Sequence, residues 1–372
     1  MESYLSLLIL LIATANPVSG TWSILAINKR TNQIGSAMAS CLDSDYYPEE
    51  ALDFLNYGFT AIPLKGGIVA QANIQDETGP AKTAGVPLLR DGHGAHAILA
   101  AMATTESDRE SITYETQAGN MSYMLYELRQ YGVVTYNESS LVAAYTGTQL
   151  TNLYAAFGFT NTEETDLSST TDDYTVSVQG NIVYPNTVEA TLNAFEVSDA
   201  TSFAERLFGA LKQGYIATGG DVRCASNSKL KGAVLSWLKV MEDDGTYSID
   251  LGAVFGASQN LSALDSIEEQ LNLWKDGESL ASTNATNTSM SSSSSQSFAE
   301  EQSESPGASA DQSTPAIELS ETLFDTVIDE SAPTEVTGQN SEEEQFQPSS
   351  PADQLRMHFT IALGITFYLA AA

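Results

Sequence analysis

The chain from Thr21 onward alternates polar and apolar positions in short runs that predict β-strands. TWSILAIN (21–28), the polar turn KRTNQ and the small-residue run IGSAMAS (34–40) predict a hairpin. The Gly, Ser and Ala residues of its second strand let another group approach closely. Similar runs bounded by turn residues predict further strands at 66–74, 132–136, 141–147, 174–184, 231–240 and 246–255.

Helical periodicity predicts fewer elements, at 94–104, 187–196, 202–213 and 266–274. Asn186 as N-cap with Glu189 three residues later resembles a capping box, and Gly214 is expected to end the third helix. Strands outnumber helices, and the helices come in pairs between sets of strands. An α+β fold of sheets covered by helices is therefore favoured over a helix bundle or a pure β-sandwich.

The pattern ends after Lys275. Residues 276–350 contain fifteen Asp and Glu, eighteen Ser and eight Thr, with no Lys or Arg. Such a segment buries too little apolar surface to offset the roughly 1 to 2 kcal/mol per residue that backbone ordering costs. We expect it to be a disordered, acidic Ser/Thr-rich stalk that follows a folded domain at 21–275.

The formal net charge of the 372-residue chain is −33, from 48 acidic and 15 basic side chains. A surface this acidic would repel a polyanion, which excludes nucleic-acid binding. The stalk carries nearly half of the charge, and residues 21–275 keep a net charge of −17. That remainder disfavours strongly acidic substrates unless Arg223 or Lys65 offsets it locally.

Residues 1–20 read as a secretory signal peptide, with an apolar run from Leu5 to Ala13 that is too short to span a bilayer. Small residues permit cleavage after Gly20 or after Ala15. A buried first strand is the alternative, because the segment before the apolar run has Glu2 and no Lys or Arg.

Residues 351–372 close with a run of fourteen uncharged, mostly apolar residues, Phe359 to Ala372, and nothing charged follows them. The run is short for a transmembrane helix and fits a signal that is replaced by a glycosylphosphatidylinositol (GPI) anchor. A membrane tail and an apolar end without a targeting role are the alternatives. Both termini together predict an extracellular, cell-surface protein.

Secretion gives meaning to two other features. Sequons for N-glycosylation occur at Asn120, Asn137, Asn260, Asn284 and Asn287, of which the last two carry little weight in Ser-rich sequence. The chain has two cysteines, Cys41 and Cys224, which in an oxidising compartment either form a disulfide or remain buried free thiols.

Most catalytic motifs are absent from the sequence. There is no G-x-S-x-G elbow, P-loop or G-x-G-x-x-G, and the chain has three His. His93 and His96 beside Asp91 can share a metal only with carboxylates from elsewhere. We prefer Asp91 as a helix cap with both His near the start of a helix, and we expect no metal and no cofactor.

Thr21 offers one complete reaction centre. If the signal is cut after Gly20, the mature chain begins with Thr21, whose hydroxyl and α-amine then form a nucleophile and base on one residue. The amine has an ordinary pKa of about 7.7 to 8.0, so it can accept the hydroxyl proton near neutral pH. Otherwise Thr21 is only the first residue after a cleavage site.

Several blocks occur in an order that resembles a known family. They are TWSILAIN, IGSAMAS, VAQAN, RQYGVV, AAYTG, VSVQGN, TVEATLNAFE, AERLFGALKQG and GGDVR, followed by LDSIEEQLNLW. Together they resemble the mainly bacterial domain of unknown function 1028 family over about residues 21–274. That family is placed in the N-terminal nucleophile (Ntn) hydrolase superfamily. The resemblance implies a four-layer αββα sandwich with two antiparallel sheets and a Thr at the position of Thr21.

The resemblance also implies amide hydrolysis through an acyl-enzyme on Thr21. Asn181 is the first candidate to hold the oxyanion, and Gln71 and the Gly180 amide are weaker ones. The supporting residues are Ser40, Gln179, Gly180, Asp221 and Arg223. Asp221 and Arg223 are expected to orient the amine or bind an acidic substrate group, and fold maintenance is the alternative for each residue.

Two segments depart from the family pattern. After Arg223 the family usually continues with a Gly and a Gln-Ser-Ala stretch, whereas this chain reads CASNSKLKGAVL. The loop expected at 160–173 is also longer than usual. If the first segment lines the pocket, the substrate or the activity differs here.

The sequence therefore predicts a secreted or surface-anchored amidohydrolase that acts on a small amide or peptide-like substrate. Its alternative is a non-catalytic surface glycoprotein that keeps the fold as a binding or display module. The expected membrane contact is the C-terminal anchor or tail, and the sequence indicates neither the substrate nor the oligomeric state.

Overall fold

The computed structural model describes residues 20–45, 47–72, 79–105, 109–116, 119–159, 162–226 and 232–277. The predicted signal peptide before Gly20, nearly all of the stalk and the C-terminal segment lie outside these residues. Within the described part of the chain, no helix combines the length and the apolar character needed to cross a bilayer.

A six-stranded antiparallel sheet forms one half of the fold, with strand order β12-β11-β2-β1-β10-β9. Its strands are β1 (Thr21–Asn28), β2 (Gln33–Ser40), β9 (Glu163–Thr170), β10 (Tyr174–Val183), β11 (Leu235–Met241) and β12 (Tyr247–Val254). The predicted hairpin is confirmed as β1 and β2, with Thr21 opposite Ser40 and Asn28 opposite Gln33. β1 lies at the centre of the sheet.

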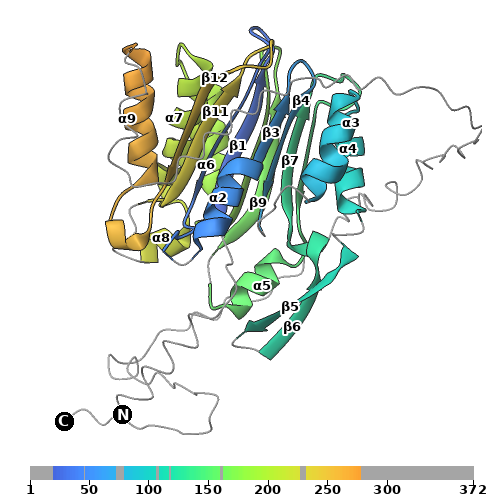
Figure 1. Cartoon of the computed structure of the whole chain (residues 1–372), viewed down its shortest axis with the longest axis vertical. Helices are drawn as coiled ribbons and strands as arrows, with labels where there is room; N and C mark the ends of the chain where they lie inside the picture. Colours follow the sequence, from blue (N-terminus) through green and yellow to red (C-terminus); the bar gives the residue numbers. More distant parts are fainter. Residues whose placement is uncertain are drawn as a thin grey trace, which may run out of the picture. The chain divides into compact units, whose positions relative to one another are not determined.

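A four-stranded sheet of order β3-β4-β7-β8 packs against it. It consists of β3 (Phe59–Ile62), β4 (Gly66–Gln71), β7 (Gln130–Thr135) and β8 (Val142–Thr146). A separate hairpin, β5 (Ser111–Thr116) and β6 (Gly119–Met124), lies beyond this sheet near α5 (Leu150–Ala156) (Figure 1).

The alternation in β1 explains how the layers pack. Leu25 and Ile27 are fully buried between the two sheets, against residues such as Val69 and Val134 of the smaller sheet. Trp22, Ile24 and Ala26 point the other way, into the layer under α6 (Thr187–Val197), α7 (Phe203–Thr218) and α9 (Ala263–Lys275). Successive side chains of a strand point to opposite faces, so one strand serves two cores.

Helices cover the outer face of each sheet (Figure 1). α3 (Val86–Arg90) and α4 (Ala95–Ala103) pack on the four-stranded sheet, while α6, α7 and α9 pack on the six-stranded one. The remaining elements are α2 (Pro48–Tyr57), α8 (Val222–Ser226), the single-turn π-helix η1 (Ala81–Gly85) and the 3₁₀ turns η3 (Leu125–Leu128) and η4 (Ala257–Gln259). The predicted α+β class with antiparallel sheets is confirmed.

Of three local predictions about helix ends, one is wrong and two are confirmed only in part. Asn186 is the N-cap residue of α6 as predicted, but its backbone is left-handed (φ 70°) and its side chain accepts no capping hydrogen bond, so the predicted capping box is absent. Gly214 lies inside α7, and the helix ends instead at Gly219 (φ 100°). Residue 214 is a glycine because a Cβ there would come within 2.1 Å of the Thr191 hydroxyl. Asp91 caps a helix, but at the C-terminal end of α3, and Gly94 precedes α4 without a side-chain cap. His93 and His96 lie near the start of α4, as expected.

The loop expected at 160–173 is mostly the strand β9. It pairs with β10 along the edge of the larger sheet, with Ser168 opposite Ser177 and Asp166 opposite Gln179. All its side chains are partly or fully exposed, and all but the exposed Leu167 are polar. An edge strand without an apolar face leaves no period-two signal in the sequence.

Candidate active site around Thr21

Thr21 is the first residue of β1 and is fully buried. It lies directly between Ser40 of β2 and Asn181 of β10. Residues opposite each other in an antiparallel pair share a face of the sheet, so these three side chains point into the layer between the sheets. The polar residues Thr21 and Ser23 thus occupy one end of the layer that Leu25 and Ile27 fill farther along.

Ser40 connects the Thr21 hydroxyl to the backbone carbonyl before it. The Thr21 hydroxyl donates to Ser40 Oγ at 3.1 Å, and Ser40 Oγ donates to the Gly20 carbonyl at 2.7 Å. The backbone N–H of Leu42 donates to the same Ser40 oxygen at 3.2 Å. The donors around Ser40 therefore leave its own hydrogen directed to the Gly20 carbonyl, which belongs to the acyl group bonded to the Thr21 nitrogen.

Arg223 holds the same carbonyl from another direction. Its Nη2 donates to the Gly20 carbonyl oxygen at 2.7 Å and to Asp221 Oδ2 at 2.6 Å. Asp221, which is fully buried, also accepts from the Arg223 backbone N–H, from Arg223 Nε and from the Cys41 N–H. Asp221 therefore fixes the position of a guanidinium whose side chain is 15% exposed.

Gly220 allows Asp221 to reach this position. It has φ 68°, and a Cβ there would come within 2.8 Å of the Trp22 ring. Gly219 before it also has a positive φ, of 100°, and glycine adopts such a backbone without a steric penalty. The backbone at these two glycines brings Asp221 into an isolated antiparallel bridge with Val183 of β10.

A disulfide joins the two segments that hold the Gly20 carbonyl. Cys41 directly follows Ser40, Cys224 directly follows Arg223, and their Cα atoms lie 5.7 Å apart. The pair closes a sequence separation of 183 residues, for which the chain-entropy model gives about 5 kcal/mol as an upper figure. Cys224 is also the first residue of the segment that departs from the family pattern, so the departure brings a covalent link to this site.

A cluster of side-chain amides lies beside Thr21 and is centred on Gln130, which the sequence did not single out. Gln130 Oε1 accepts from Asn181 Nδ2 at 3.0 Å and from Gln71 Nε2 at 2.5 Å. Its Nε2 donates to the Gly180 carbonyl at 3.0 Å. The signal for Gln130 in the sequence was its place in the block RQYGVV, just before the strand predicted at 132–136; in the structure it is the first residue of β7.

Two candidate oxyanion donors, Asn181 and Gln71, differ in how this cluster uses them. Gln71 Nε2 donates to Gln130 Oε1 and to the Thr21 backbone carbonyl, the latter at 3.4 Å. Both N–H groups of Gln71 therefore already have acceptors, and neither acceptor is the Thr21 hydroxyl. Among the residues that the structure describes, none donates to Gln71 Oε1, although that atom is buried. Asn181 shares the face of Thr21, and its Oδ1 accepts from the Tyr154 hydroxyl at 3.3 Å.

Tyr154 was also missed by the sequence analysis. It comes from α5 and is buried, and desolvation raises the pKa of its phenol well above the ordinary value. The phenol is therefore neutral at physiological pH and can donate to Asn181. This hydrogen bond restricts the orientation of the Asn181 side chain.

Gln179 and Gly180 maintain the packing around the site. Gln179 Oε1 accepts from the Ser23 hydroxyl at 3.1 Å, and Gly132 makes room for this amide, since a Cβ at Gly132 would lie 2.3 Å from Gln179 Nε2. A Cβ on Gly180 would lie 2.6 Å from Val188 in α6. The fold-maintenance interpretation fits both residues.

A chain of hydrogen bonds runs from Gln130 to Asp166 on β9. Gln130 Nε2 donates to the Thr146 hydroxyl, which donates to Asp166 Oδ2 at 2.6 Å. Desolvation is the largest cause that raises the pKa of Asp166 above 3.8. The charged carboxylate is therefore less favourable in the folded chain than in the unfolded one.

The raised pKa of Asp166 predicts a pH dependence of stability. Between its unfolded and folded pKa values the native state binds more protons, so the contribution of Asp166 falls as the pH rises through that window. Asp166→Asn keeps an acceptor for Thr146 and removes the titration. We expect the stability of the variant relative to the parent chain to be higher at pH 7 than at pH 4 in urea unfolding. A relative stability that is lower at pH 7 would contradict the raised pKa.

The predicted glycosylation sites differ in their surroundings. Asn120 and Asn260 are exposed. Asn137 is partly buried, and its Nδ2, the atom to which a glycan would be attached, donates to the Gly92 carbonyl at 2.8 Å. Asn284 and Asn287 lie outside the described residues. Glycosylation stays a prediction at each position.

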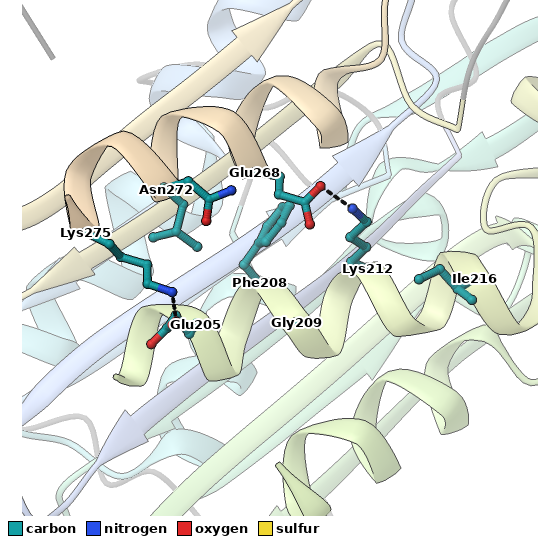
Figure 2. A pocket seen from close by; sticks show the side chains of 9 residues that line it. Glu205, Phe208, Gly209, Lys212, Ile216, Glu268, Asn272 and Lys275 are labelled. Carbon is teal, nitrogen blue, oxygen red and sulfur yellow. Dashed lines mark hydrogen bonds and ion pairs between the residues drawn. The ribbon is translucent and has the colours of Figure 1, made fainter. Parts of the chain in front are cut away.

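A separate pocket of about 230 Å³ lies between α7 and α9 (Figure 2). Lys275 pairs with Glu205 at 2.5 Å and Lys212 pairs with Glu268 across it, so its charges are already neutralised within the described structure. The pocket belongs to the helical layer on the outer face of the larger sheet. Thr21 faces the opposite side of that sheet.

A family model described as "Family of unknown function (DUF1028)" matches residues 21–253. The chain belongs to the DUF1028 family. The match begins at Thr21 and includes Ser40, Gln71, Gln130, Asn181, Asp221 and Arg223, so the whole polar cluster lies within the DUF1028 domain. No curated protein matches this chain at a significant level.

Among solved structures, the DUF1028 domain is similar to the crystal structure of a Silicibacter pomeroyi protein that carries the same family model. The two chains are 17% identical, and the TM-score is 0.47. The alignment covers 70% of this chain and 90% of the other.

Proposed function

We propose that this DUF1028 protein is an amide hydrolase that uses Thr21 as an N-terminal nucleophile, exposed when residues 1–20 are removed. The observation that carries the proposal is the pair of donors on the Gly20 carbonyl. Ser40 Oγ and Arg223 Nη2 both lie 2.7 Å from this acyl oxygen, which belongs to the group bonded to Thr21. Two side chains thus donate to an acyl carbonyl directly beside Thr21. Thr21 would combine a hydroxyl with a free α-amine once residues 1–20 are removed.

The layers of the fold support the finer part of the proposal, an Ntn-type αββα sandwich. Two antiparallel sheets pack face to face, and helices lie on both outer faces (Figure 1). The nucleophile of such a fold is expected at the start of a central strand, which is the position of Thr21 in β1.

In the proposed reaction Thr21 Oγ attacks the substrate carbonyl and the Thr21 amine takes the hydroxyl proton. Ser40 Oγ and Arg223 Nη2 donate to the developing oxyanion, a contribution worth about 3 to 4 kcal/mol for one such donor. Asp221 positions Arg223 through three contacts. This assignment replaces Asn181 as the first candidate donor and leaves it to support the wall of the site beside Thr21.

The burial of Thr21 favours the second candidate function, a non-catalytic surface module. With Gly20 attached, Thr21, Ser40 and Asn181 are each 0% exposed. Under the hydrolase proposal, Gly20 is part of what covers the hydroxyl, and its removal opens the site. The two functions therefore differ in whether a free Thr21 amine is required.

The test compares three preparations of the chain on a panel of amides. One begins at Thr21, one retains Gly20 before it, and one begins at Thr21 with its amine acetylated. We expect turnover only from the first, because the other two have an amide nitrogen in place of the base. Equal turnover by all three would contradict the proposal, and so would a secreted chain whose sequenced N-terminus is Asn16.

A further inference from the structure

The Gly20 residue occupies a space that has no room for a side chain. A Cβ on Gly20 would lie 2.7 Å from Ile182 Cβ, 2.9 Å from Asp221 Oδ2 and 3.1 Å from the Asn181 carbonyl oxygen. Contacts under 3.0 Å force a neighbour to shift. Among the standard residues, only glycine therefore fits this space without displacing a neighbouring atom.

We call Ile182 and Asp221, whose atoms limit this space, the wall of the site, and both are held in place. The Ile182 contact is made by its Cβ, which no rotamer change can move. Ile182 is fully buried in a bulge of β10 where the backbone φ is 51°, an unfavourable value for a β-branched residue. Asp221 is held by Arg223, and its Oδ2 also accepts from the Cys41 N–H at 3.1 Å.

The same space is where an acyl group transferred to Thr21 must lie. The Gly20 carbonyl carbon is bonded to the Thr21 nitrogen, and the Thr21 hydroxyl is on the same residue. In the proposed acyl-enzyme, the carbonyl oxygen of the acyl group on Oγ accepts hydrogen bonds from Ser40 and Arg223, as the Gly20 carbonyl oxygen does here. The α-carbon of that acyl group would then lie close to the position of the Gly20 α-carbon. Removal of residues 1–20 vacates this position and leaves its walls.

We propose that the site accepts amides whose acyl carbon is attached to an unsubstituted CH₂ or CH₃, such as N-acylglycyl and acetyl amides, and rejects those with a side chain there. This inference rests on the proposed function, because it assigns the acyl subsite of that hydrolase. The same two residues, Ile182 and Asp221, would then exclude a side chain at position 20 of the chain and at the acyl α-carbon of the substrate.

The reaction balances as a hydrolysis. Thr21 Oγ forms a bond to the acyl carbon and its proton passes to the Thr21 amine. The C–N bond of the amide then breaks, and the departing nitrogen takes that proton. A water then attacks the resulting ester and gives one proton to the Thr21 amine. The C–Oγ bond breaks as the amine passes this proton to Thr21 Oγ. The products are a carboxylic acid and an amine.

The kinetic test uses the chain that begins at Thr21 with two substrates, N-acetylglycine 4-nitroanilide and N-acetyl-L-alanine 4-nitroanilide. We expect kcat/KM for the glycyl substrate to be about 10-fold higher or more, as one badly placed methyl group costs in a tight pocket. Equal kcat/KM values with turnover that depends on Thr21 would overturn the subsite and leave the hydrolase proposal intact.

A matched pair of variants tests the wall itself. Ile182→Gly removes the Cβ that the alanyl methyl would meet, and glycine suits the left-handed backbone at this position. We expect the ratio of kcat/KM for the glycyl substrate to that for the alanyl substrate to fall several-fold in this variant. Ile182→Ala also empties the side-chain space but keeps the Cβ, and its ratio is expected to stay near that of the parent chain. A ratio that falls to the same extent in both variants would contradict a role for this atom.

A binding measurement separates the two proposals if no turnover is seen. Thermal unfolding of the chain from Thr21, and of its Thr21→Ala variant, is followed with N-acetylglycine and with N-acetyl-L-alanine. Stabilisation by the glycyl acid alone, without turnover, would retain the subsite and overturn the hydrolase. Equal stabilisation by both acids, or by neither, would overturn the subsite.

Discussion

Thr21→Ala, in the chain that begins at residue 21, is expected to lower amide hydrolysis by roughly 10³-fold or more, the scale seen when a nucleophile is removed. The variant keeps the α-amine, the Ser40 and Arg223 donors and the surrounding walls. What it lacks is the oxygen that attacks the carbonyl. The measurement is kcat/KM on the glycyl 4-nitroanilide, with thermal unfolding to check that the fold is retained.

Thr21→Ser is the matched control for this prediction. It restores a hydroxyl that can donate to Ser40 Oγ, as the Thr21 hydroxyl does at 3.1 Å. We expect kcat/KM to stay within about 10-fold of the parent chain, because nucleophile and base are both present. Equal turnover by the Ala, Ser and parent forms would exclude Thr21 as the nucleophile.

The elements that the sequence predicted well are those with an apolar face. β1, β2, β4, β7, β8, β10, β11 and β12 all carry buried apolar side chains that set the strand period. β9 was missed because it is a polar edge strand that relies on β10 for its hydrogen bonds. Gly214 was misread because a glycine inside a helix looks like a helix end until the close approach of Thr191 is known.

The site divides in a similar way. Thr21 could be proposed from the sequence alone, because the proposed chemistry depends only on its place after a predicted cleavage site, and Ser40 and Arg223 came from the family resemblance. Their convergence on one carbonyl was not predictable, since it depends on an antiparallel pairing and on the Arg223 side chain, which lies 203 residues from Gly20 in sequence. Gln130 and Tyr154 were missed because a single buried Gln or Tyr has no pattern around it.

The disulfide was left open by the sequence, which offered two cysteines and no geometry. In the structure it links the residue after Ser40 to the residue after Arg223. The two donors on the Gly20 carbonyl are thus fixed by a covalent bond as well as by Asp221. Such a constraint fits a site whose donors must be positioned before the substrate arrives.

Asp221→Asn is expected to destabilise the fold by about 3 to 5 kcal/mol, the usual cost of removing one partner of a buried ion pair. Asp221 is fully buried and Arg223 is 15% exposed, so solvent cannot replace the lost charge. The new amide also brings N–H donors toward a position where Arg223 and Cys41 already donate. The measurement is urea unfolding at pH 7 with the disulfide intact.

Asp173→Asn is the matched control, because it makes the same chemical change in an exposed pair. Arg30 and Asp173 have side chains that are 72% and 34% exposed, so water screens the pair and its contribution to stability is small. We therefore expect the control to unfold at nearly the same urea concentration as the parent chain. If Asp221→Asn changes unfolding as little as the control does, the carboxylate does not hold Arg223, and the donor that the hydrolase proposal places on the acyl oxygen loses its support.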